Sequence, residues 1–292
     1  MILLDGKKTS IEIKEGIKKI VSAMKLKGER VPHLAAVLVG NDGASVTYVG
    51  SKVRSCEYVG FKSTLIRLEN DISEEDLLKQ IQKLNRDNAL DGYIVQLPLP
   101  KHIDEEKILL AIDSKKDVDG FHPTNFGRMA LELDAFIPAT PYGIIKLLER
   151  YKVPTSGKNC LVVGRSNIVG RPISILMSQK GISGNATVTL AHSRTENLKK
   201  LTEQADIIIM ALGIPEFLTA DMVKDNACII DVGITRVIDQ NKPKGYVIKG
   251  DVSFDAVSKK AEYITPVPGG VGPMTIAMLL QNTLQARQQN LS

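Results

Sequence analysis

Short apolar runs, each closed by a turn signal, recur along the first half of the chain. Residues 34–39 form the first run, Leu-Ala-Ala-Val-Leu-Val, and Gly40-Asn-Asp-Gly43 closes it. Further strands are expected near residues 62–68 and at residues 91–96. Segments with helical spacing separate these runs, so the expected order is strand, helix, strand, helix, strand. That order favours a parallel sheet covered by helices.

The two helices between these strands have predicted limits. The first carries apolar residues at helical spacing from Val46 to Cys56, and Gly60 supplies a stop signal. The second opens with Ser73-Glu-Glu-Asp, which resembles a capping box, and extends to about residue 86. Residues 101–138 have weaker periodicity and several turn signals, and we expect the passage to a second lobe there.

The second half of the chain alternates in the same way and predicts a second α/β lobe. Thr140-Pro141 is typical of an N-cap followed by proline at the first helical position. A last helix is expected over about residues 274–287, folding back onto the first lobe. Strands are expected at residues 160–163, 187–190, 206–210 and 228–232.

Composition narrows the class of protein. The 292 residues are 43% hydrophobic and 24% charged, which excludes disordered, collagen-like and coiled-coil chains. No apolar run approaches the roughly 20 residues that cross a bilayer, and the N-terminus meets acidic residues too early for a signal peptide. The net charge of +5 is spread along the chain. We therefore expect a cytosolic protein with neither a nucleic-acid nor a membrane partner.

No metal site is expected. The three cysteines, Cys56, Cys160 and Cys228, are far apart among apolar neighbours, which favours reduced and buried thiols. Asp117 and Asp119 lie two residues apart, but the full pattern of a calcium loop is absent.

A candidate nucleotide loop lies in the second lobe. The run Val163-Gly-Arg-Ser-Asn-Ile-Val-Gly-Arg-Pro172 follows a predicted strand and opens a predicted helix. In that context backbone N–H groups bind a pyrophosphate. The glycine spacing is not G-x-G-x-x-G, so a tight turn without a ligand remains an alternative.

The end of the next strand indicates which dinucleotide binds. This strand ends in His192-Ser-Arg-Thr195, where NAD-binding proteins commonly have an acidic residue. Ser193 and Arg194 would attract a 2′-phosphate that a carboxylate would repel, and Arg165 could reach the same group. The pattern favours NADP over NAD, while a solvated surface charge is the alternative for Arg194.

A second candidate site lies in the first lobe. Tyr48 and Lys52 are four residues apart and project from one helix face, so they could position a substrate and move a proton. The alternative is a lysine whose stem lies along an amphipathic tyrosine. Short-chain dehydrogenases share Tyr-x-x-x-Lys, but their glycine-rich loop precedes it, and here the order is reversed. Gln96 ends a predicted strand, where ligands of parallel sheets bind.

These motifs occur in one order along almost the whole chain. The first lobe contains Tyr48-x-x-x-Lys52 with Cys56 and Gly60, Asp91-Gly-Tyr-Ile-Val-Gln-Leu-Pro-Leu-Pro100, Lys116-Asp-Val-Asp-Gly120 and Pro138-Ala-Thr-Pro-x-Gly143. The second contains Gly164-Arg-Ser-x-x-Val-Gly-Arg-Pro172, His192-Ser-Arg-Thr195, Asp231-Val-Gly-Ile234 and Pro266-Val-Pro-Gly-Gly-Val-Gly-Pro-Met-Thr275. Together they closely resemble the bifunctional methylenetetrahydrofolate dehydrogenase/methenyltetrahydrofolate cyclohydrolase (FolD) family.

The resemblance implies two reactions and a division of roles. NADP would oxidise 5,10-methylenetetrahydrofolate to the 5,10-methenyl form, and water would then open this to 10-formyltetrahydrofolate, in one-carbon metabolism. Lys52 would be the central catalytic residue, oriented by Gln96. Tyr48 would pack against the folate ring and Asp119 would bind the pterin N–H groups. Further substrate contacts are implied for Pro98, Gly270 and Pro273, and cofactor contacts for Thr140, Gly164, Arg165, Ser166, Gly170, Ser193, Arg194, Ile234 and Thr275.

The resemblance also implies an architecture. Residues 1–137 would form a catalytic, folate-binding domain and residues 138–273 a Rossmann-type NADP domain, with a cleft between them. The helix over residues 274–292 would pack back onto the first domain. A homodimer through the nucleotide lobe is expected, with tetrahydrofolate derivatives, polyglutamylated ones among them, as ligands. The alternatives are a dehydrogenase with little cyclohydrolase activity and a catalytically silent nucleotide-binding module.

Overall fold

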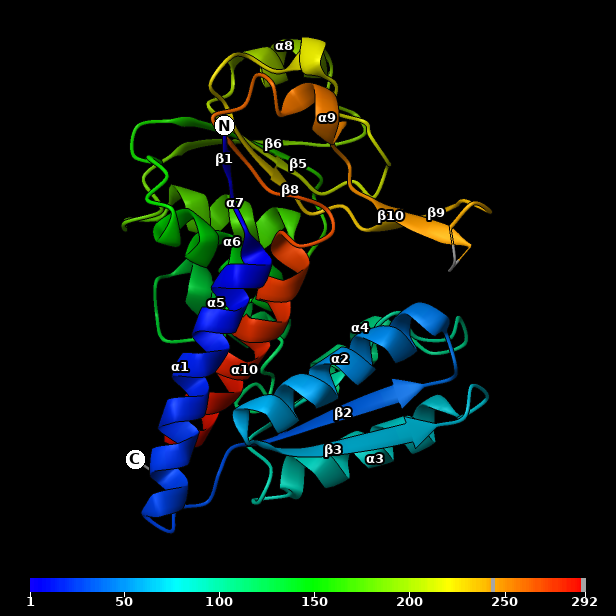
Figure 1. Ribbon diagram of the computed structural model, residues 1–292. Coiled ribbons are helices and arrows are strands. Elements are labelled where there is room, and N and C mark those ends of the chain that lie inside the picture. Colours follow the sequence, from blue (N-terminus) through cyan, green and yellow to red (C-terminus); the bar gives the residue numbers. More distant parts are fainter. Residues whose placement is uncertain (243–244, 290–292) are drawn as a thin grey trace. The chain divides into compact units, whose positions relative to one another are not determined.

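The contacts within the chain divide it into two compact units. The computed structural model describes residues 1–242 and 245–289 (Figure 1). The six-stranded unit comprises Met1–Ser10 and Thr140–Thr275, and the three-stranded unit comprises Ile11–Ala139 and the residues from Ile276 onward. Both units are built on parallel sheets, which confirms the predicted α/β fold class. The predicted domain boundaries and the cleft stay predictions.

The three-stranded unit is the predicted parallel sheet with its helices. The strand order is β3-β2-β4, and the central strand is buried along its whole length because a neighbour covers each edge and helices cover the faces. The strands are β2 (His33–Val39), β3 (Lys62–Leu68) and β4 (Gly92–Val95). The helices between and after them are α2 (Gly43–Val59), α3 (Glu74–Arg86), α4 (Glu105–Ala111) and α5 (Pro123–Ala130). The prediction of these strands, of α2 and of α3 is confirmed.

Local signals set the ends of α2 and α3. The Asp42 side chain accepts the backbone N–H of Ser45 at 2.8 Å, and Gly60 ends α2 with a φ of 83° that favours glycine. Ser73 caps α3 as predicted by accepting the N–H of Asp76. The Ser73 hydroxyl also donates to the Asp76 carboxylate, so the reciprocal bond of a full capping box is replaced by a bond between the two side chains.

The six-stranded unit is a Rossmann-type sheet with the strand order β1-β11-β8-β7-β5-β6, parallel throughout. Its strands are β1 (Ile2–Leu3), β5 (Asn159–Val163), β6 (Thr187–Ala191), β7 (Ile207–Met210), β8 (Cys228–Asp231) and β11 (Tyr263–Ile264). The chain passes from β5 to β6 on one side and then returns to β7 on the other. Ligands of such sheets bind at this switch of direction, beyond the carboxyl ends of the strands.

Helices and a hairpin complete this unit. The helices are α6 (Ala139–Arg150), α7 (Gly170–Ser178), α8 (Leu198–Gln204) and α9 (Phe254–Val257). The antiparallel hairpin β9 (Thr235–Ile238) and β10 (Tyr246–Lys249) extends away from the sheet in Figure 1.

Three features differ from the sequence predictions or extend them. Helix α6 begins at Ala139, so the prediction of Thr140 as an N-cap is wrong: its hydroxyl forms a 3.0 Å hydrogen bond with the Thr275 hydroxyl instead. Helix α10 (Val271–Gln289) begins three residues earlier than predicted, and the predicted residues 290–292 lie outside the described residues. The N-terminal residues form β1 and α1 (Gly6–Leu26), which the sequence patterns do not predict.

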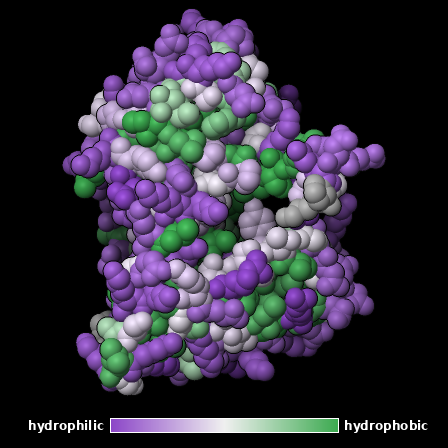
Figure 2. Space-filling model, viewed as in Figure 1, coloured by the Kyte–Doolittle hydropathy of each residue, from purple (hydrophilic) through white to green (hydrophobic). Residues whose placement is uncertain are grey.

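The surface and the cysteines agree with the composition. Hydrophilic residues cover most of the face in Figure 2, with hydrophobic residues in separate patches. Cys56, Cys160 and Cys228 are free and buried, which confirms that prediction. Among the described residues, no helix has the length and hydropathy that crossing a membrane requires.

Candidate functional site

Lys52 is a lysine buried on α2, with only 8% of its surface exposed. Its Nζ donates a 3.2 Å hydrogen bond to Oε1 of Gln96, which directly follows β4. The Gln96 side chain is fixed in turn, because its Nε2 donates to the Leu97 carbonyl at 2.7 Å. Burial lowers the pKa of Lys52, and the nearby Asp119 carboxylate opposes this shift. A lysine in this environment can act as a neutral amine and accept a proton.

The α2 helix gives Lys52 one polar and one inert neighbour on the same face. Tyr48, one turn earlier, keeps 36% of its surface exposed, so its ring is accessible to a ligand. Cys56, one turn later, is fully buried, and burial raises its thiol pKa to about 12. The thiol therefore stays neutral and is no nucleophile. On this face of α2, Tyr48 and Lys52 are therefore the residues available for binding or proton transfer.

Asp119 completes the polar group in the three-stranded unit. It lies on an irregular segment that a bridge between Tyr93 and Asp117 ties to β4. Burial raises the pKa of Asp119, whereas the Lys52 ammonium lowers it. Pro98, in the turn after Gln96, is exposed and follows a cis peptide bond. The structure thus brings Lys52 and Gln96 into contact and Asp119 within electrostatic reach of Lys52.

The predicted nucleotide loop joins β5 to α7 and requires glycine at two positions. Gly164 has a φ of 119°, and a Cβ there would lie 2.2 Å from the Ala211 carbonyl oxygen. A Cβ on Gly170 would lie 1.9 Å from the Gly164 oxygen. Ser166 Oγ accepts the N–H groups of Val169 and Gly170 and so caps α7. The loop is compact, which allows a phosphate to approach its backbone.

Two predicted cofactor residues lie on the turn after the neighbouring strand. The turn after β6 closes through a 2.8 Å bond from the His192 N–H to the Thr195 hydroxyl, leaving Ser193 and Arg194 exposed. Arg165 and Ser166 are exposed in the loop after β5. Since β5 and β6 are parallel neighbours, these side chains lie at the same edge of the sheet. Two arginines and two hydroxyls at one edge fit a phosphorylated dinucleotide.

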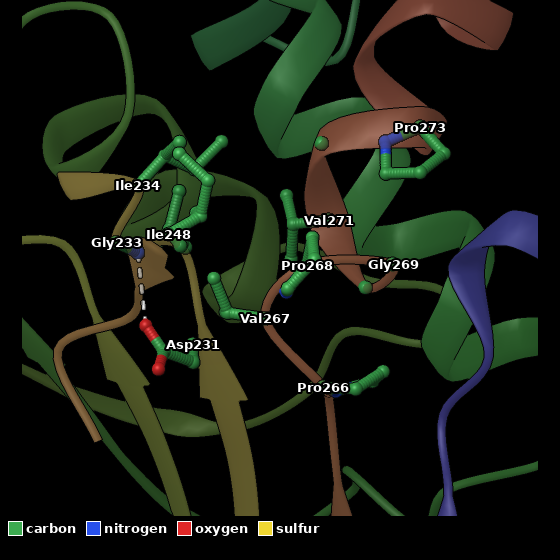
Figure 3. Close-up of a pocket in the computed structure, with 13 residues that line it drawn as sticks. Asp231, Gly233, Ile234, Ile248, Pro266, Val267, Pro268, Gly269, Val271 and Pro273 are labelled. Carbon is green, nitrogen blue, oxygen red and sulfur yellow. Dashed lines mark hydrogen bonds between the residues drawn. The ribbon is translucent and has the colours of Figure 1, made fainter. Parts of the chain in front are cut away.

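A pocket lies beyond β8 in the six-stranded unit (Figure 3). Ile234, Gly270 and Pro273, all singled out from the sequence, line it together with the glycine- and proline-rich run over residues 266–273. Apolar side chains predominate in its wall, and Asp231 accepts the Gly233 N–H at 2.9 Å. Such a pocket suits a flat ring with few polar edges.

The predicted site residues are divided between the two units of the chain. Tyr48, Lys52, Gln96, Pro98 and Asp119 belong to the three-stranded unit. Gly270, Pro273, Ile234, Thr140 and Thr275 belong to the six-stranded unit, with the residues of the nucleotide loop. Within the described residues no group of three or more His, Cys, Asp or Glu side chains could hold a metal ion.

Sequence reasoning considered Asp117 only as a candidate metal ligand and a motif residue, and it missed Asn125 and Asn282, the other buried polar residues around the Asp119 segment. Asp117, Asn125 and Asn282 are all at most 5% exposed and hydrogen-bonded around the Asp119 segment. Asn282 is distant in sequence and sits in a helix without a motif, so only its apolar surroundings could have drawn attention to it.

Comparison with known proteins identifies what the chain is similar to. Sequence models of the tetrahydrofolate dehydrogenase/cyclohydrolase family match residues 4–119 with its catalytic domain and residues 138–291 with its NAD(P)-binding domain. The bifunctional protein FolD of Flavobacterium johnsoniae is 69% identical over 288 residues, covering 99% of this chain and 98% of the relative.

Solved structures agree with the sequence matches. The FolD methylenetetrahydrofolate dehydrogenase/cyclohydrolase of Campylobacter jejuni has a TM-score of 0.92 and 48% identity over 99% of both chains. The dehydrogenase-cyclohydrolase of Trypanosoma brucei, solved in complex with NADP and an inhibitor, has a TM-score of 0.94 and 34% identity. That match covers 100% of this chain and 98% of the other.

Proposed function

The chain belongs to the tetrahydrofolate dehydrogenase/cyclohydrolase family, and from that premise we propose which of its residues carry the two reactions. It is a bifunctional enzyme of one-carbon metabolism. It oxidises 5,10-methylenetetrahydrofolate to the 5,10-methenyl form with NADP and then hydrolyses the product to 10-formyltetrahydrofolate. The residue roles that follow are our proposal.

Lys52 is the proton-transfer group of the hydrolysis. A water molecule adds to the methenyl carbon, and the bond from this carbon to N5 breaks. One of the two water protons ends on N5 and the other is released. The neutral Lys52 amine accepts the proton of the attacking water, and Gln96 holds its Nζ in place. The observation that carries this role is the burial of Lys52 with a lowered pKa and a 3.2 Å bond to Gln96. Because the methenyl substrate is a cation, it disfavours an ammonium beside it and favours the neutral amine.

Five further residues bind and orient the folate. The Asp119 carboxylate accepts hydrogen bonds from the pterin N–H groups, since a carboxylate offers only acceptors. The half-exposed Tyr48 ring stacks on the substrate, and the exposed Pro98 packs at its edge. Gly270 and Pro273 contact substrate from the pocket of the six-stranded unit.

The remaining predicted residues bind NADP, which takes up the hydride of the oxidation. The Gly164–Gly170 loop can bind a pyrophosphate because its two glycines have no side chains and the backbone can therefore fold compactly. Arg165, Ser166, Ser193 and Arg194 bind phosphate groups at the carboxyl edge of β5 and β6. Ile234 packs against the cofactor ring that accepts the hydride, and the Thr140–Thr275 hydroxyl pair donates to the cofactor.

The proposal extends to the domains and the assembly. Residues 1–137 form the folate-binding domain and residues 138–273 the NADP domain, with the final helix joining the first; the start of the NAD(P)-binding family model at residue 138 supports the boundary between them. Two copies of the chain pair through the NADP domain, and the edge of β6, which pairs only with β5 among the described residues, supports this. The cytosolic location stays a prediction.

The experiment that tests the role of Lys52 is its replacement by an isosteric apolar residue. Lys52→Met should lower cyclohydrolase turnover by about 10³-fold or more, because no other amine of the described residues donates a hydrogen bond to Gln96, while NADP binding survives. The matched control is Lys79→Met, which removes an exposed lysine from α3 and should leave both activities unchanged. Retained formation of 10-formyltetrahydrofolate by Lys52→Met would overturn the assignment.

A further inference from the structure

The Asp119 carboxylate depends on backbone that has no regular structure of its own. Residues 112–122 contain neither a helix nor a strand, apart from the single bridge at Asp117. A ligand-binding carboxylate on such a segment keeps its position only if other groups hold the chain on both sides. Two independent sets of hydrogen bonds do so.

The first set is built on Asp117. Its carboxylate is 2% exposed, and Oδ2 accepts the backbone N–H of His122 at 2.8 Å and Nδ2 of Asn125 at 2.9 Å. Asn125 Nδ2 also donates to the Ser114 carbonyl at 2.8 Å. These bonds tie the residues before Asp119 to those after it and close the loop around Gly120, whose φ is 76°.

The second set comes from the C-terminal helix. Asn282 on α10 is fully buried, and its Nδ2 donates to the carbonyls of Val118 at 2.8 Å and Ile137 at 2.9 Å. The Val118 carbonyl belongs to the peptide group that leads into Asp119. The segments that contain these carbonyls pack closely, since a Cβ on Gly120 would lie 2.6 Å from the Phe136 oxygen.

The buried side-chain amide of Asn282 donates hydrogen bonds but accepts none from the described residues. Its Oδ1 accepts no hydrogen bond from the described residues, although it is buried. A side chain selected only for stability would avoid burying that oxygen. The two donated bonds, which join the Asp119 segment to residue 137, are therefore the function of this amide.

We propose that Asn282 and Asp117 are positioning residues, which fix the backbone of Asp119 and thereby set the affinity for folate. This inference deepens the proposed function and rests on the proposed role of Asp119. Both side chains are buried, so their effect reaches the substrate through the Asp119 carboxylate. A displacement of a binding group by less than 1 Å is enough to weaken binding strongly.

The test compares Asn282→Ala with Thr283→Val, the matched control. Thr283 is also fully buried, and its hydroxyl donates only to the Leu279 carbonyl within α10. Asn282→Ala should raise the KM for the folate substrate about tenfold and leave the KM for NADP within about twofold. Thr283→Val should leave the KM for folate and the KM for NADP within about twofold of wild type, although its loss of thermal stability should be comparable to that of Asn282→Ala. An unchanged folate KM in Asn282→Ala, or equal increases in both variants, would overturn the proposal.

A second pair keeps the test decisive if Asn282→Ala does not fold. Asp117→Ala should raise the folate KM about tenfold, and Asp117→Asn should restore it to within about threefold, because an amide oxygen can accept the same two N–H groups. Equal impairment of both variants would contradict a positioning role. Asp119→Asn distinguishes a failure of this inference from a failure of the proposed function. If Asp119→Asn leaves the folate KM unchanged, the proposed folate-binding role of Asp119 is itself wrong.

Discussion

At the scale of single residues, the surroundings of Lys52 determine its protonation state, on which its proposed role as a base depends. Burial favours the neutral amine, and the Asp119 carboxylate favours the ammonium, so the pKa of Lys52 reflects a balance between them. Because the pKa lies below its ordinary value of 10.5, more of the neutral base is present at a given pH. The carboxylate that we propose to bind folate therefore also raises the pH at which Lys52 becomes the neutral amine.

This balance predicts the direction of a pH shift. Cyclohydrolase turnover should rise with pH as Lys52 loses its proton. Asp119→Asn removes the carboxylate that raises the pKa of Lys52, so the rising limb should move to lower pH. The measurement is the pH dependence of kcat at saturating methenyl substrate, with Asp71→Asn, an exposed carboxylate, as the control. A limb that stays in place or moves to higher pH would contradict the account.

The residues that the sequence predicts are those with local spacing. Tyr48 and Lys52 are recognisable because four residues place two side chains on one helix face. Asn282 is not, because its partners Val118 and Ile137 are more than a hundred residues away and no local pattern encodes such contacts. Buried polar residues that serve distant backbone carbonyls become visible only when the fold is known.

At the scale of elements, strands and helices with strong periodicity are predictable and those that depend on distant partners are not. The β2, β3 and β4 runs are apolar enough to be recognised alone, whereas β1 has two residues and exists through its pairing with β11. Helix α1 buries Ile17, Val21 and Met24 at helical spacing, but polar residues and Gly16 weaken the signal. The Thr140 hydroxyl, predicted to cap α6, is instead hydrogen-bonded to Thr275, a distant partner that sequence patterns do not encode.

Substitution by alanine should have opposite effects at two glycines that lie in helices, because only one of them has space for a Cβ. Gly170→Ala places a Cβ 1.9 Å from the Gly164 oxygen, so the nucleotide loop must open, and NADP affinity should fall tenfold or more, about 1.4 kcal/mol. Gly16→Ala meets nothing within 4 Å in the middle of α1 and should stabilise the protein by about 1 kcal/mol.

Both outcomes are measurable on purified protein. NADP affinity is obtained by calorimetric titration and stability by urea unfolding, and Gly16→Ala serves as the control for cofactor binding. Unchanged NADP affinity in Gly170→Ala would show that the loop does not approach the cofactor as proposed. A loss of stability in Gly16→Ala would show that α1 has less space there than the structure gives it.

At the scale of the whole molecule, the chain crosses between its two units inside helices. The boundaries after Ser10, Ala139 and Thr275 fall within α1, α6 and α10, respectively. The six-stranded unit therefore requires the first ten residues of the chain, and the three-stranded unit requires the last helix. Sequence patterns predict the two α/β lobes but not this exchange of termini, because β1 is too short to be recognised and its partner is distant.

One edge of the larger sheet supports the proposed homodimer. Strand β6 pairs only with β5 among the described residues, so its other edge presents unpaired backbone groups. We expect a second copy of the chain to cover this region in a twofold dimer. Light scattering at micromolar concentration should give twice the chain mass of 31.9 kDa. A monomer under these conditions would refute the proposed homodimer.

The central claim, that one chain performs both reactions with NADP, is tested most directly by a product assay. The wild-type protein is incubated with 5,10-methylenetetrahydrofolate and either NADP or NAD, and the reduced cofactor, the methenyl form and the 10-formyl product are measured together. The account predicts reduction with NADP far in excess of NAD, and 10-formyltetrahydrofolate as the end product. Accumulation of the methenyl form would leave a dehydrogenase alone, and no reduction with either cofactor would contradict the account entirely.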